Sequence, residues 1–149
     1  MKRVWIAALA FIGTPALAQA PSDPIKPVAT MKQLMVDMIH PASNDILLFA
    51  YRSGPKNKRD ERDWAAVRRS AVTLAEAGNL LMMRGRARDQ GDWMKDCKLL
   101  VDAATAAYKA AQAKDGTALA AVTEALDASC TTCHKQYRPN VFPPEGASK

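Results

Sequence analysis

The chain contains 149 residues with a formal net charge of +6; 48 % of the residues are hydrophobic, 24 % are charged and 6 % are aromatic. This length suits one domain, and the composition excludes a disordered acidic tail, a collagen-like fibre and a polytopic membrane protein. Alanine is abundant and β-branched residues are few, which favours helices over a β-sandwich. No nucleic-acid motif accompanies the modest positive charge, so we expect no nucleic-acid partner.

Residues 1–20 have the pattern of a secretory signal peptide. Lys2 and Arg3 precede an apolar run over residues 4–12, and residues 18–20 read Ala-Gln-Ala, a small-x-small cleavage site. The run is too short to span a bilayer. We therefore expect a cleaved signal peptide, no membrane anchor after cleavage, and a mature chain in the periplasm, where disulfides can form.

Hydrophobic periodicity predicts two helices in the first half of the mature chain, over residues 30–51 and 61–83. Thr30 is the expected N-cap of the first, and Pro41 predicts a kink or break near His40. Three methionines share one face of this first helix: Met31, Met35 and Met38. The second helix carries an apolar stripe at helical spacing: Trp64, Val67, Ala71, Leu74, Gly78 and Leu81.

Two further helices are predicted over residues 92–114 and 117–138, with a tight break at Asp115-Gly116. Pro139 ends the last helix, and residues 139–149 form an irregular C-terminal tail. Four helices of about twenty residues with short connections suit an up-down-up-down four-helix bundle. The predicted fold class is therefore all-α, with the bundle domain over residues 21–138.

The chemically informative segment is Cys130-Thr-Thr-Cys133-His134. The C-x-x-C-H spacing is typical of a covalent haem attachment site. On a helix, residues i, i+3 and i+4 lie on one face. Cys130 and Cys133 are then placed to form one thioether each with a haem vinyl group, and His134 is directed at the iron. Export through a signal peptide agrees with this interpretation of the motif, because c-type haem is attached after secretion.

Other interpretations of the two cysteines are weaker. A redox dithiol sits at a helix N-terminus, where the helix dipole lowers the thiol pKa, whereas this motif lies near a helix C-terminus. A zinc site requires a fourth ligand, for which only Cys97 and His40 remain. A disulfide across two residues within a helix is strained. Cys97 itself is expected to be a buried helix thiol, with an intermolecular disulfide as the alternative.

The segment from Cys130 to Arg138 resembles the C-x-x-C-H-x-x-[YF]-[RK] ending of the class II cytochromes c, which include cytochrome c′ and the low-spin cytochrome c556 group. Residues 31–35 and 75–81 are also similar to segments of c556-like proteins. The resemblance implies a four-helix bundle with one covalently attached haem c at one end and no enzymatic activity. It also implies a distal haem side that faces the first helix.

The sixth iron ligand separates the two functions that this resemblance implies. A low-spin haem with His134 and Met35 as axial ligands implies a periplasmic monohaem electron carrier. A five-coordinate iron implies a cytochrome c′-like protein that binds NO or CO. The family's first-helix position falls on Met35. Met35 is expected about 7 Å along its helix from the predicted start, and His134 about 6 Å along its helix from the predicted end. These two helix ends lie side by side in an up-down-up-down bundle, so the two residues are expected at matching heights. Met38, Met31 or no ligand remain open, as does a second histidine ligand at His40.

The same bundle geometry predicts the walls of the haem pocket. Leu81, Met82, Trp93 and Cys97 are expected to approach the haem end, and Tyr137 packs either on the haem edge or in the core. The resemblance suggests that Arg138 hydrogen-bonds a haem propionate. Three arginines lie in a loop at this end, where they neutralise propionates, face an acidic redox partner or are simply solvated: Arg84, Arg86 and Arg88.

The remaining expectations concern partners. The partners implied are redox partner proteins, and the resemblance implies a homodimer through the first two helices. Apolar residues off the main stripe of the second helix are compatible with that dimer: Val72, Leu80 and Met83. Four basic residues fall at the opposite end of the bundle and are discounted as haem-edge contacts: Arg52, Lys56, Lys58 and Arg59.

Overall fold

The computed structural model describes residues 25–52 and 59–141, and within these ranges the protein is entirely helical. A first helical stretch consists of α1 (Met31–Gln33), the π-helix η1 (Leu34–Ile39) and α2 (His40–Arg52). We call residues 31–52 the N-terminal rod. Three longer helices follow: α3 (Glu61–Leu81), α4 (Asp92–Ala113) and α5 (Gly116–Tyr137). The all-α prediction is confirmed, and no strand occurs in the described ranges.

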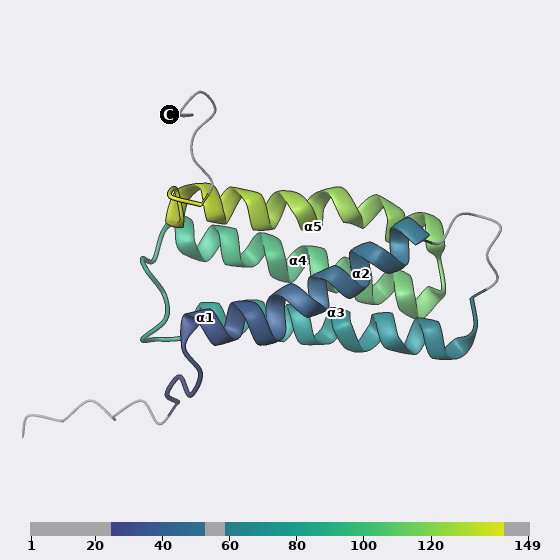
Figure 1. Ribbon diagram of the computed structural model, residues 1–149, viewed down its shortest axis with the longest axis horizontal. Helices are drawn as coiled ribbons and strands as arrows, with labels where there is room; N and C mark the ends of the chain where they lie inside the picture. Colours follow the sequence, from purple (N-terminus) through teal and green to yellow (C-terminus); the bar gives the residue numbers. More distant parts are fainter. Residues whose placement is uncertain (1–24, 53–58, 142–149) are drawn as a thin grey trace, which may run out of the picture.

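The rod and the three long helices run alternately up and down (Figure 1). Helix α4 packs against both α3 and α5, and α2 contacts α3 and α5, which closes the bundle. One end therefore brings together the start of the rod, the α3–α4 loop and the end of α5. None of the helices in the described part combines the length and apolarity needed to cross a bilayer.

The helix ends lie close to where the sequence predicts them, because local capping fixes them. Thr30 caps the rod as expected: its side chain accepts from Gln33 N, and the Gln33 side chain accepts from Thr30 N. Asp60 and Asp63 form the same reciprocal box at the start of α3. Lys114 ends α4 in the left-handed conformation, and Asp115 caps α5. Each cap satisfies backbone groups that the helix leaves unpaired.

The region around Pro41 differs from the predicted kink or break. The chain stays helical through His40, and the turn before Pro41 widens into the π-helix. Pro41 lacks an amide hydrogen, and its ring clashes with the carbonyl four residues earlier in a regular α-helix. A π-helical turn accommodates that conflict without ending the helix.

The predicted apolar stripes form the core. All six stripe residues of the second predicted helix are buried on α3, from Trp64 to Leu81. Small residues on α4 let the helices approach closely, and Ala104, Ala107 and Ala111 have no exposed surface. The predicted signal peptide, residues 53–58 with Lys56 and Lys58, and the tail beyond residue 141 lie outside the described residues.

Gly78 marks the closest approach of α3 to α4. A Cβ atom built on Gly78 would lie 2.6 Å from Val101 Cγ2 and 3.6 Å from the Val101 backbone nitrogen. We expect Gly78→Ala to lower the unfolding free energy by about 1–2 kcal/mol, since overpacking outweighs the higher helix propensity of alanine. Urea denaturation measures this change.

Gly116→Ala is the matched control. Its added Cβ would meet only the flexible end of Arg59, with Nη1 at 3.3 Å. We expect the control to leave the unfolding free energy within about 0.5 kcal/mol of wild type. A Gly78→Ala protein as stable as this control would contradict the close packing of α3 on α4.

Candidate functional site

Cys130, Cys133 and His134 lie on one face of α5, three to seven residues before the helix ends at Tyr137. All three side chains are half-buried and face the end of the bundle where the rod begins. None of the chain's three cysteines is in a disulfide. The i, i+3, i+4 spacing thus presents two thiols and one imidazole side by side, as the sequence predicts.

This face of α5 forms one wall of a cavity of about 400 Å³. The cavity has the size of an ordinary small-molecule or cofactor site. Its walls come from the N-terminal rod, the α3–α4 loop, the start of α4 and the end of α5. The lining residues are Met31, Lys32, Met35, Val36, Arg88, Trp93, Cys133, His134, Tyr137 and Arg138.

A smaller cavity of about 30 Å³ lies between these residues and the core. It shares Met35, Cys133 and His134 with the larger cavity, so the two cavities are neighbours at those side chains. Its other lining residues are Ile39, Leu81, Asp96, Cys97, Leu100, Ser129 and Cys130. Both cysteines of the motif therefore border space that protein atoms do not fill.

The structure brings Met35 and His134 to the same cavity from two different elements, η1 and α5. Met31 lines the outer part of that cavity. Met38 packs against the core and lines neither cavity. His40 is exposed on the rod. Of these four residues other than His134, only Met35 lines both cavities.

Burial sets the electrostatics of the motif. It raises the pKa of the Cys133 thiol to about 11, with a further contribution from Asp96, and it also raises the pKa of Cys130. Both thiols are protonated at neutral pH, unlike the activated thiolates of redox dithiols. Burial and then the charge of Arg138 lower the pKa of His134, so its imidazole is neutral and able to donate a lone pair to a metal.

Cys97 is a buried helix thiol, only 1 % exposed, as predicted. Burial, and to a smaller degree Cys133, raises its pKa to about 12. Within the described ranges, no group of three or more His, Cys, Asp or Glu side chains is arranged to hold a metal ion.

Tyr137 and Trp93 build a rigid wall of the larger cavity. Their rings meet edge to face with centroids 4.9 Å apart. The Tyr137 hydroxyl donates to Asp89 Oδ2 at 2.5 Å, while Asp89 Oδ1 accepts from Gly91 N and Trp93 N. These hydrogen bonds lower the pKa of Asp89, the Tyr137 bond contributing most. The Asp89–Tyr137 contact thus ties the α3–α4 loop to the end of α5.

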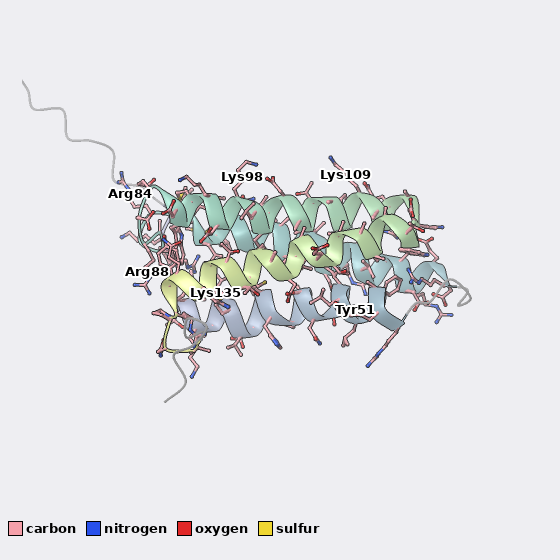
Figure 2. All side chains as sticks on the ribbon, turned by 90° about the horizontal axis from the view of Figure 1, so that it is seen from above. Tyr51, Arg84, Arg88, Lys98, Lys109 and Lys135 are labelled. Carbon is pink, nitrogen blue, oxygen red and sulfur yellow. The ribbon has the colours of Figure 1, made fainter. Side chains whose placement is uncertain are left out.

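Three basic side chains line the cavity, and we call them the basic rim: Lys32, Arg88 and Arg138. Figure 2 shows Arg84 and Arg88 at the same end of the bundle as Lys135 on α5, while Tyr51 lies toward the other end. Arg59 stacks over Phe49 and Trp64 on α2 and α3, away from the lining residues. The rim gives the cavity mouth a positive character suited to carboxylates.

The position of Arg86 differs from the prediction that the loop arginines are solvated or face the pocket. It is buried, and its guanidinium donates to Leu80 O at 3.2 Å and to Ala29 O at 3.0 Å. Arg86 thereby fastens the α3–α4 loop to the segment that leads into the rod. Met82, predicted near the pocket, packs against the core and lines neither cavity.

Asp96 is the main site residue that sequence reasoning missed. It is 7 % exposed, lines the smaller cavity, and its Oδ2 has no hydrogen-bond partner among the described residues. Burial raises its pKa, and the nearby carboxylates Asp92 and Asp89 add to that effect. The sequence does contain a pattern that indicates a buried carboxyl group, because Asp96 falls beside Trp93, Cys97 and Leu100 on the apolar face of α4.

We compared the chain with known protein families, curated proteins and solved structures. No protein-family model, no curated protein and no solved structure matches this chain.

Asp96→Asn tests the burial of that carboxyl group. Because the folded-state pKa is raised, the folded protein holds this proton more tightly than the unfolded chain, and stability is lost as pH rises above the ordinary value. We expect the melting temperature of the variant, relative to wild type, to increase between about pH 4 and about pH 7. Circular dichroism melts at several pH values measure it.

Asp92→Asn is the control, because the pKa of Asp92 is lowered whereas that of Asp96 is raised. A hydrogen bond from Lys95 lowers the pKa of Asp92, so this carboxylate stabilises the fold above its ordinary pKa. The relative melting temperature of this variant should fall as pH rises toward about 4 and stay level between about pH 5 and about pH 7. Parallel profiles for the two variants would contradict the buried position of Asp96.

Proposed function

We propose that this protein is a periplasmic electron carrier that holds one covalently attached haem c with His134 and Met35 as axial iron ligands. One observation carries the proposal: a C-x-x-C-H motif lines a cavity together with a methionine that comes from a different element. The resemblance of the segment from Cys130 to Arg138 to class II cytochromes c supports the same conclusion.

The residues present fit a haem. Cys130 and Cys133 are protonated and both border the smaller cavity, which suits thioether attachment. His134 is neutral and Met35 is uncharged, so both can ligate iron without losing a proton. Trp93 and Tyr137 offer aromatic surface to a flat apolar ring system. The basic rim offers partners for the two propionates.

A bound haem supplies one-electron chemistry as its iron alternates between the ferric and ferrous states. The chain's own contribution is to fix the axial ligands, to exclude water and to set the potential. A thioether ligand favours the reduced iron over harder ligands, so Met35 raises the potential. The Asp89–Tyr137 contact holds the aromatic wall in place while the charge changes.

The proposed location follows from residues 1–20, whose pattern predicts export and cleavage. The mature chain then meets redox partner proteins in the periplasm. The basic rim favours an acidic partner surface near the haem edge. A homodimer through the first two helices is the assembly that the resemblance implies.

The absorption spectrum of the exported protein tests the proposal together with a Met35→Ala variant. We expect wild type to show a low-spin ferrous spectrum with a sharp α band. Met35→Ala removes the sixth ligand and should give a high-spin spectrum, carbon monoxide binding and a lower reduction potential. Met38→Ala is the matched control, because Met38 lies one turn away and lines neither cavity.

Two results would contradict parts of this proposal. A Met35→Ala protein that keeps the low-spin spectrum would exclude Met35 as the ligand. A wild-type protein that is high-spin and binds carbon monoxide would favour the alternative, a five-coordinate cytochrome c′-like protein that binds NO or CO.

A further inference from the structure

The N-terminal rod does not present its methionines as a regular α-helix would. Three residues along an α-helix are about 60° short of a full turn, so Met35 and Met38 would share a face. In the structure both side chains pack against the core, but Met35 lines both cavities and Met38 lines neither. The two residues are separated by the π-helical turn that includes them both, Leu34–Ile39.

The burial pattern shows what this turn does to the register. Leu34 and Ile39 are 1 % and 6 % exposed, although they are five residues apart. In an α-helix, residues five apart point about 140° away from each other. The π-helical i→i+5 pattern aligns them, and His40 N–H donates to Met35 O in this pattern. Leu34 therefore takes the core position, and Met35 next to it is turned toward the cavity.

A regular helix through the same residues would give a different assignment. Met35, Ile39 and Ile46 lie within about 40° of one another at α-helical spacing. Ile39 and Ile46 are both buried in the bundle. Met35 would then enter the buried face of the rod, and Leu34 would rotate away from the core. The π-helical turn thus lies where the two methionines differ, because Met35 lines both cavities and Met38 lines neither.

The cause of the turn lies at its C-terminal end. Pro41 follows directly after His40, and its ring would clash with the carbonyl of Asp37 in an α-helix. Pro41 is exposed, and it is not among the residues that line either cavity. Its effect on the site is therefore exerted through the backbone rather than by contact.

We propose that Pro41 is a positioning residue which, by imposing the π-helical turn, directs Met35 into the cavity as the axial ligand. This inference rests on the proposed function, since it assigns a role in the coordination of the haem iron. Pro41 lines neither cavity, so it acts through Met35.

The test compares Pro41→Ala with Asn44→Ala in the exported haem protein. Asn44 is exposed on the same helix, one turn further on, and its replacement also raises helix propensity without removing a proline. We expect Pro41→Ala to lose low-spin signal and to shift the reduction potential downward, as Met35→Ala does. Asn44→Ala should keep the wild-type spectrum and potential.

A purely structural role for Pro41 would change the melting temperature and leave the spectrum unchanged, which would overturn the inference. If Met35→Ala is still high-spin in that case, the proposed function stands. A wild-type protein without haem would overturn both. The crystal structure of Pro41→Ala gives a second readout: His40 N–H should donate to Val36 O, and retention of the bond to Met35 O would also overturn the inference.

Discussion

The candidate site depends on the helical period of α5, because only that period places two thiols and an imidazole on one face. At one end of the bundle, Cys130 borders the smaller cavity, and Cys133 and His134 border both cavities. The up-down-up-down arrangement then decides what lies opposite. The start of the N-terminal rod reaches the same end as the last turns of α5, so Met35 and His134 share a cavity although they are far apart in sequence.

The loop between α3 and α4 completes this end of the bundle through polar contacts. Asp89 joins the loop to Tyr137, and Arg86 joins it to the segment before the rod. Trp93 donates its indole N–H to Leu81 O at 2.9 Å, which fixes the ring that forms the cavity wall. Hydrogen bonds of this kind hold the cavity wall in place, which suits the proposed electron transfer because little has to reorganise when the charge changes.

Much of the fold was predictable from the sequence because periodicity and capping are local. Thr30, Asp115 and the stripe on α3 mark helix ends and buried faces without reference to the rest of the chain. The position of Met35 at the same end of the bundle as His134 was predictable, because Met35 lies near the start of the first helix and His134 near the end of the last. The π-helical turn was not predictable, since Pro41 allows a kink, a break or a widened turn, and core packing selects among them. The inward position of Arg86 depends on a carbonyl 57 residues away, which no local pattern reports.

The covalent attachment of haem to Cys130 and Cys133 is the central claim. Mass spectrometry of the exported and denatured chain after treatment with a thiol-alkylating reagent tests it most directly. We predict that the peptide with these two cysteines carries one haem and no alkyl group, whereas Cys97 is alkylated. A peptide without haem and with both thiols alkylated would contradict the proposed function.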